Sequence, residues 1–194
     1  MLSQLSTLKA RLAITVSDYD TILTSALTAI SFRFDNECNR TFARTTSALH
    51  EFDTTDVEIT VPCYPIETVT KFELKENETD GWIEQTNVEY LIRKSCVISL
   101  RFPLSTLSSQ PSTCRLTYTG GYVLPGTTPG AGQTALPSDI EQAAIEQAAA
   151  WFQNRDKLGL IRNWPSGGTY QVFSQLDLLP NVKAVLRRYE RHNP

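Results

Sequence analysis

Apolar residues recur at helical spacing through the first 42 residues of the chain. Leu5, Leu8 and Leu12 predict a short amphipathic helix. A longer helix is expected from an N-cap at Ser17, with Asp18 and Asp20 in its first turn, to about Asn39. Its buried face is predicted to contain Ile22, Ala26, Ile30 and Phe34, widened by Leu23 and Leu27. Arg33 and Arg40 are expected off this face, as solvated or ion-paired side chains.

Residues 48–119 alternate apolar and polar positions with a period of two, which is typical of strands. Four sets of side chains are each predicted to share a face: Val57, Ile59 and Val61; Thr70, Phe72 and Leu74; Cys96, Ile98, Leu100 and Phe102; and Cys114, Leu116 and Tyr118. Turn signals at residues 62–65, 77–81 and 120–121 separate them. The pattern predicts five or six short antiparallel strands in a small sheet or sandwich, with residues 103–113 as a surface loop.

Residues 120–137 contain five of the nine glycines and three prolines, which argues against regular structure. We interpret the segment as a linker in preference to a mobile binding loop. A phosphate cradle is not supported, because the Walker pattern with its lysine and hydroxyl residue is missing.

The clearest helix lies within residues 137–159. Ser138 and Glu141 have the spacing of a capping box, and Asp139 places negative charge at the positive end of the helix dipole. Gly159 is expected to end the helix in a left-handed cap. Five alanines crowd its middle, and their small side chains let another backbone approach closely. These features predict a tightly packed central helix.

A less regular arm follows Gly159, and Pro180 precedes a last amphipathic helix. Its apolar side is predicted to comprise Val182, Val185, Leu186 and Tyr189. Lys183, Arg187 and Arg191 form a basic row at i, i+4 spacing, with Arg188 and His192 nearby. Two interpretations stay open. The cations complement the helix dipole, or the segment docks in a partner's groove or on DNA phosphates.

Together these zones predict an α+β protein in which a small bundle of N-terminal and central or C-terminal helices carries an inserted antiparallel sheet or sandwich. The expected boundaries are residues 1–47 and 137–168 for the helical core, 48–119 for the inserted β region, 120–136 for the glycine- and proline-rich loop, and 169–194 for the C-terminal arm and helix.

Composition narrows the class of function. The net charge of −3 argues against a protein that coats nucleic acid. The N-terminus lacks the pattern of a signal peptide, and no apolar run is long enough to cross a bilayer, so a cytosolic site of synthesis is expected. The four cysteines, Cys38, Cys63, Cys96 and Cys114, contain no Cys-x-x-Cys pair and are interpreted as buried, reduced side chains.

A search for catalytic chemistry finds no candidate. His50 and His192 are the only histidines, and neither lies near a nucleophile elbow. No carboxylate pair stands out, and neither a zinc pattern nor a calcium loop is present. The sequence therefore predicts a structural protein with no catalytic residue, cofactor or metal.

The order of these elements resembles the head–tail connector, or head-completion adaptor, proteins of tailed bacteriophages, in the branch that carries a β insertion. Three stretches carry the likeness: LKARLAITVSDYDTILTSALTAISFRFDNECNRTF (8–42), VPCYPIETVTKFEL (61–74) with RLTYTGGY (115–122), and LPSDIEQAAIEQAAAWFQNRDKLG (136–159). The order and spacing of the three stretches carry the resemblance.

The resemblance implies a subunit of the phage neck at the head–tail junction, made in the bacterial cytoplasm. Such subunits form a ring, typically twelvefold, that docks on the portal after DNA packaging, extends the DNA channel without sequence-specific binding, and presents a platform for the next neck or tail protein. No membrane partner is implied. A site for the portal is expected in the C-terminal segment, at Tyr170, Val172, Phe173, Lys183, Leu186, Arg187, Arg188, Tyr189 and Arg191. Packing between subunits is expected at Ala144, Ala148, Trp151 and Arg155.

Three alternatives remain from other classes. The first is another virion binding module, either a tail-completion or a capsid-decorating protein. The second is a small DNA-binding accessory protein, whose affinity would fall steeply with salt and would depend on Arg187 and Arg191. The third is a hydrolase with an unrecognised carboxylate pair.

Overall fold

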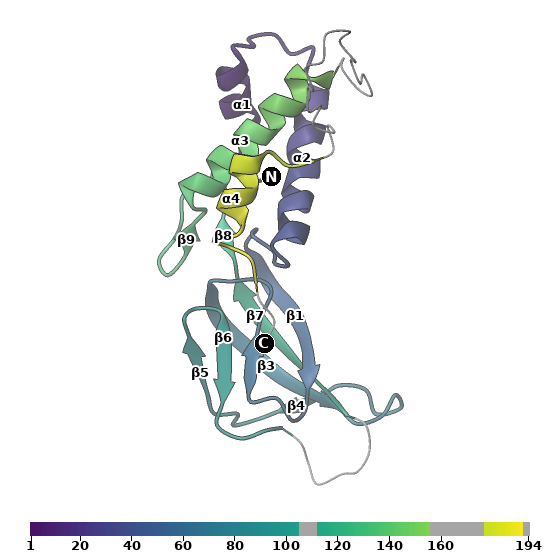
Figure 1. Ribbon diagram of the computed structural model, residues 1–194. Coiled ribbons are helices and arrows are strands. Elements are labelled where there is room, and N and C mark those ends of the chain that lie inside the picture. The colour runs from purple at the N-terminus through teal and green to yellow at the C-terminus, as the bar shows by residue number, and fades with distance from the viewer. Residues whose placement is uncertain (105–111, 156–176, 192–194) are drawn as a thin grey trace. The chain divides into compact units, whose positions relative to one another are not determined.

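The computed structural model describes residues 1–104, 112–155 and 177–191, and the chain divides into two compact units (Figure 1). The helical unit comprises Met1–Cys38 and Pro137–Glu190. The β unit comprises Asn39–Leu136 and Arg191–Pro194. The chain thus passes from one unit to the other three times, after Cys38, Leu136 and Glu190.

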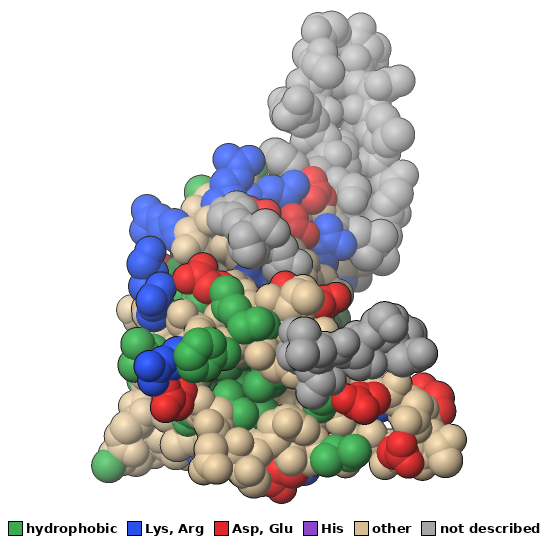
Figure 2. All heavy atoms as spheres, turned by 90° about the horizontal axis from the view of Figure 1, so that it is seen from below, with side chains coloured by type: hydrophobic (Ala, Val, Ile, Leu, Met, Phe, Trp, Pro, Cys, Tyr) green, Lys and Arg blue, Asp and Glu red, His purple; other side chains and the backbone are tan. Residues whose placement is uncertain are grey.

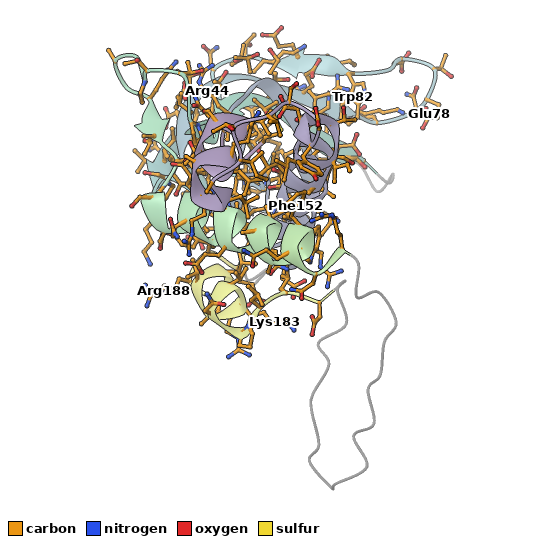
Figure 3. All side chains as sticks on the ribbon, turned by 90° about the horizontal axis from the view of Figure 1, so that it is seen from above. Arg44, Glu78, Trp82, Phe152, Lys183 and Arg188 are labelled. Carbon is orange, nitrogen blue, oxygen red and sulfur yellow. The ribbon has the colours of Figure 1, made fainter. Side chains whose placement is uncertain are left out.

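The helical unit is built around one central helix. Its elements are α1 (Leu5–Leu12), α2 (Asp20–Glu37), α3 (Ser138–Gln153) and α4 (Pro180–Leu186). Helix α3 contacts all three of the others, and Figure 3 shows it between α4 and the pair formed by α1 and α2. Its alanines at 143, 144 and 148 are buried, so the predicted close packing of the central helix is confirmed.

The ends of the long helices differ from the prediction. Pro137 is the N-cap of α3, because its extended backbone (φ −56°, ψ 133°) suits that position, and Ser138 is already helical. The capping box is therefore wrong, and the Glu141 carboxylate instead accepts a 3.5 Å hydrogen bond from the Ser3 hydroxyl. Helix α3 ends at Gln153 with Asn154 as its C-cap, whereas Gly159 lies outside the described residues.

The start of α2 and one position of its buried face, Ile22, were also predicted incorrectly. The helix begins at Asp20 with Tyr19 as its N-cap, so Ser17 does not cap it. The buried face contains Leu23, Leu27, Ile30 and Phe34. Ile22 was predicted to lie on this face, but its side chain is 52% exposed. The packed face is therefore the one that Leu23 and Leu27 define, and the Ile22 side of the helix faces outward.

The β unit is a sandwich of two antiparallel sheets, which confirms the fold class. The strands are β1 (Thr45–Asp53), β2 (Glu58–Thr60), β3 (Ile66–Lys75), β4 (Ile83–Gln85), β5 (Tyr90–Arg93), β6 (Val97–Leu100) and β7 (Thr113–Gly120). One sheet has the order β1-β7-β3-β4 and the other the order β2-β6-β5. Both sheets contribute to one core, whose buried members are Phe52, Ile59, Val61, Cys63, Ile66, Phe72, Leu74, Ile98, Leu100, Cys114, Leu116 and Tyr118.

Most of the predicted period-two sets form this core. The exceptions are Val57, Thr70 and Phe102, which are exposed, and Cys96, which is half-buried and lies outside the core cluster. Phe102 is 66% exposed and lies beyond the end of β6.

The glycine- and proline-rich segment contains regular structure that was not predicted. Strand β8 (Tyr122–Val123) pairs in parallel with β9 (Thr134–Ala135), and Tyr122 also bridges to Ala43. Gly121 permits this path, because its φ is +97° and an added Cβ would lie 2.7 Å from the Ala43 carbonyl oxygen. The segment therefore anchors the chain between β7 and α3 before the helix begins.

Candidate docking surfaces

The C-terminal helix is shorter than predicted and its apolar side is covered by its own unit. Helix α4 ends at Leu186, after which residues 187–189 continue as turns. Val182 and Leu186 are 0% and 2% exposed. A partner can therefore reach Leu186 only if α4 first leaves the helical unit.

The basic side chains of this helix point outward. Figure 3 shows Lys183 on α4 and Arg188, two residues beyond the end of the helix, projecting on the side away from α3. Arg187 and Arg188 are exposed, and Lys183 forms a 2.8 Å ion pair with Asp177. The Lys183 ammonium and the backbone N–H of Leu178 hold the pKa of Asp177 below its usual value. We refer to Lys183, Arg187 and Arg188 as the C-terminal basic surface.

Two other members of the predicted portal site have different surroundings. The Tyr189 hydroxyl donates to the Asp139 carboxylate at 2.8 Å, which ties it to the start of α3. Arg191 belongs to the β unit, so the basic row predicted from i, i+4 spacing does not extend to it. Tyr170, Val172 and Phe173 lie outside the described residues.

Gln147 fixes the segment that leads into α4. Its side chain is fully buried on α3, donates to the Asp177 carbonyl at 3.4 Å and accepts from the Leu179 N–H at 2.9 Å. One side chain therefore satisfies two backbone groups that precede the helix.

We expect Gln147→Leu to lower the free energy of unfolding of the helical unit by about 1–3 kcal/mol, because it leaves these two backbone groups without a partner in a site of similar volume. Urea denaturation followed by far-UV circular dichroism measures this. The matched control is Gln142→Leu on the exposed side of α3, for which a change within about 0.5 kcal/mol is expected. Equal effects of the two variants would contradict the role of Gln147.

The residues predicted to pack between subunits fall into two groups. Ala144 and Ala148 are 1% and 0% exposed, so their own chain covers them. Trp151 is half-buried, and Arg155 is exposed with its guanidinium 4.2 Å from the centre of the Phe152 ring. Of the four, Arg155 presents the most surface to a neighbour.

Helix α2 presents an outward face that the sequence analysis missed. Its sequence from Thr21 to Phe32 contains no charged residue. The exposed positions are Thr21, Ile22, Ser25, Thr28, Ala29 and Phe32, which we call the α2 outer face. A shallow depression runs along it, and Phe32 is 66% exposed. An uncharged face of this kind suits close contact with another protein surface.

Large hydrophobic side chains are also exposed at one edge of the β unit. Strand β5 is an edge strand, all four of its residues are exposed, and Leu91 reaches 67%. Figure 2 shows hydrophobic side chains gathered among charged ones on one face of the molecule. Exposed edge strands can pair with strands of other chains.

Arg40 is buried, contrary to the prediction of a solvated or ion-paired side chain. It is 4% exposed, and its guanidinium carbon lies 3.4 Å from the ring centre of Tyr64, 4.6 Å from that of Phe42 and 5.2 Å from that of Tyr122. It donates to the Tyr64 carbonyl, and no ion pair to Arg40 is found within the described ranges. The three rings therefore provide most of the environment of this cation.

A charged network covers the outer face of the four-stranded sheet. Glu73, with a side chain that is 7% exposed, lies 2.8 Å from Lys71 and 2.9 Å from Arg115. The Arg115 guanidinium lies 4.1 Å from the centre of the Trp82 ring. Burial acts to raise the pKa of Glu73, but hydrogen bonds from Lys71 and Arg115 outweigh it and hold the pKa below its usual value.

The lowered pKa of Glu73 gives a pH-dependent prediction. A carboxylate whose pKa is lower in the folded state stabilises the fold above its unfolded pKa of about 4.3, and this contribution is lost as the pH falls through the folded pKa. We expect Glu73→Gln to be about 1–2 kcal/mol less stable than wild type near pH 7, and this difference to shrink near pH 3. Urea denaturation at both pH values measures it, and a pH-independent difference would refute the assignment.

Three of the four cysteines are buried, as predicted, and Cys96 is half-buried. The Cys63 thiol donates to the Gly120 carbonyl at 3.1 Å. Burial, assisted by Asp53 and Asp56, raises the pKa of Cys114 to about 11. Cys114 therefore stays protonated at neutral pH.

A hollow opens beside β1 and β2, at one edge of each sheet. It is lined by His50, Glu51, Phe52, Asp56, Glu58, Ile59, Thr60 and Arg191. Burial and the positive charge of Arg191 lower the pKa of His50, although Glu51 acts to raise it.

Within residues 1–104, 112–155 and 177–191, no cluster of three His, Cys, Asp or Glu side chains could hold a metal ion. No described helix is long and apolar enough to span a membrane.

No protein-family model and no curated protein matches the chain. Its fold is nevertheless that of chains found in the neck of a phage-like particle, which agrees with the resemblance drawn from the sequence. A chain of the neck of an empty gene transfer agent (GTA) particle, computed with C6 symmetry, matches with a TM-score of 0.61 and 16% identity, covering 100% of this chain and 91% of that chain.

Two further structures agree. A chain of the virion of the native gene transfer agent particle matches with a TM-score of 0.56 and 17% identity, over 100% of this chain and 91% of that one. A chain of the native particle's neck, computed with C12 symmetry, matches with a TM-score of 0.52 and 18% identity, over 89% of this chain and 84% of that one. At these identities the likeness establishes a shared fold.

Proposed function

We propose that the protein is a structural subunit of a virion neck, a connector that forms a ring on the portal, extends the DNA channel and carries the next neck or tail protein. The observation that carries the proposal is the shared fold with a neck chain over the full length of this one, at a TM-score of 0.61. The proposed site of action is the head–tail junction, and the proposed role is non-enzymatic.

Self-association is supported by symmetry and by the surface of the helical unit. The neck structures with this fold were computed with C6 and C12 symmetry. A closed ring uses two different faces of each subunit, so that one face of each copy contacts another face of the next. The α2 outer face, which is uncharged and exposes Ile22 and Phe32, is suited to be one of them. Arg155 remains a candidate for the other.

Portal docking is proposed for the C-terminal segment. The C-terminal basic surface projects into solvent and is suited to an acidic surface on a partner. Each contact alone is weak, but many copies that engage a symmetric partner together bind strongly. The net charge of −3 also suits a conduit that does not retain passing DNA.

Co-sedimentation with the portal protein of the same genome, followed by electron microscopy of the pellet, tests the proposal. Full-length protein should add a ring to the portal, and a version that ends at Gly168 should not. Arg187→Glu with Arg188→Glu should weaken binding, whereas Lys94→Glu with Arg101→Glu, an equal charge change on exposed residues of the β unit, should not. Absence of binding by folded full-length protein would refute portal docking and favour a tail-completion or capsid-decorating role.

A further inference from the structure

The hollow beside β1 and β2 has a composition that favours a cation. Its volume is about 280 Å³, and three of its lining residues, Glu51, Asp56 and Glu58, are acids. These two strands are edge strands of different sheets, so the hollow lies where neither sheet continues. Among the described residues that line it, Arg191 is the only lysine or arginine, and Arg93, outside the lining, forms a 3.1 Å ion pair with Glu58.

Arg191 occupies this hollow through a loose contact. Its guanidinium donates to the Thr60 carbonyl at 3.4 Å, near the upper limit for a hydrogen bond. Its Nε is buried and has no hydrogen-bond partner among the described residues. The guanidinium therefore lies in a hollow lined by three acids but is incompletely hydrogen-bonded there, which suits a contact that has to be released.

We propose that the hollow is an arginine-binding site that holds Arg191 within the β unit in the free subunit, and that docking on the portal requires Arg191 to leave it. The proposal rests on the proposed function, because it assigns the competing contact to the portal. While Arg191 occupies the hollow, a subunit cannot dock. The apparent affinity for the portal is therefore the intrinsic affinity multiplied by the fraction of subunits in which the hollow is empty.

The contact can be tested without any portal. His50 lies in the hollow facing Glu51, Asp56, Glu58 and Arg191, and its imidazole signals can be followed by NMR, with His192→Gln used to separate the two histidines. Arg191→Ala should raise the pKa of His50, because a neighbouring positive charge is removed. Arg188→Ala, which removes an equal charge from the exposed end of the C-terminal segment, should leave it unchanged. An unchanged pKa in Arg191→Ala would overturn the proposal.

Release is tested from the side of the hollow, so that the docking segment itself stays intact. Glu51→Gln with Glu58→Gln should strengthen portal binding about three- to tenfold, because a neutral hollow holds Arg191 less well. Glu78→Gln with Glu84→Gln, an equal charge change on exposed acids elsewhere in the β unit, should not change the affinity. Unchanged or weaker binding by the hollow variant would overturn the release step. Failure of every variant to bind, with the His50 response intact, would refute portal docking while supporting the arginine site.

Discussion

Gly121→Ala is expected to lower the free energy of unfolding by about 3–4 kcal/mol, the largest effect that we predict for a single substitution. Two costs combine. The backbone at Gly121 has a φ of +97°, which L side chains rarely adopt, and an added Cβ would lie 2.7 Å from the Ala43 carbonyl oxygen and 2.8 Å from the Arg44 Cα. Both neighbours are backbone atoms, so relief requires movement of the chain that enters β1. Urea denaturation measures the loss, followed by Trp82 fluorescence in a Trp151→Phe, Trp164→Phe background so that the signal reports on the β unit.

Two further glycines separate the costs. Gly81 has a φ of +70° and open space around its missing Cβ, so Gly81→Ala should cost only the conformational part, about 1–2 kcal/mol. At Gly120 an added Cβ would lie 2.5 Å from the Cys63 carbonyl oxygen, so Gly120→Ala isolates the steric part. If Gly121→Ala proves no more costly than Gly81→Ala, the close approach of the two backbones is not the constraint described above.

Arg40→Ala is expected to destabilise the β unit by about 2–4 kcal/mol. The substitution empties the space between the rings of Phe42, Tyr64 and Tyr122 and removes the donor to the Tyr64 carbonyl. Chemical denaturation monitored by Trp82 fluorescence in the same background measures the effect.

Arg40→Met and Arg33→Ala provide the comparison. Methionine fills much of the same volume without a buried charge. If packing dominates, Arg40→Met should therefore lower the free energy of unfolding by only about half as much as Arg40→Ala does. Arg33 is exposed and its ion pair to Glu37 spans 3.5 Å, so Arg33→Ala should change stability by less than about 0.5 kcal/mol. An effect of Arg40→Ala as small as that of Arg33→Ala would contradict the caged arrangement.

Sequence patterns predicted the elements that depend on local periodicity. The central alanine-rich helix, the α+β class and most of the core strands follow from side chains that recur with the period of their own element. The resemblance to phage connector proteins is likewise matched by the fold of neck chains from gene transfer agents.

The errors arise where distant residues decide the outcome. Arg40 is buried because Tyr64 and Tyr122, which are far away in the sequence, close around it. The outward side of α2 could not be identified, because Ile22 and Leu23 are equally apolar and only packing against α3 decides between them. Arg191 fits the spacing of a basic helical row, but the helix ends at Leu186 and the chain enters the β unit. The sequence showed that the C-terminal segment is basic, but it did not show that Arg191 lies in the β unit.

The order in which the units can fold follows from the position of α3 in the chain. Helices α1 and α2 contact α3, which begins about a hundred residues after α2 ends. During synthesis the first two helices leave the ribosome without the central helix against which they pack, whereas all strands of the sandwich emerge before α3 does. The sandwich can therefore form first, and the helical unit can close only when α3 has been made. Until α3 has been made, the apolar faces of α1 and α2 stay exposed. Rapid packing of α3 against them is then needed to avoid premature association with other copies.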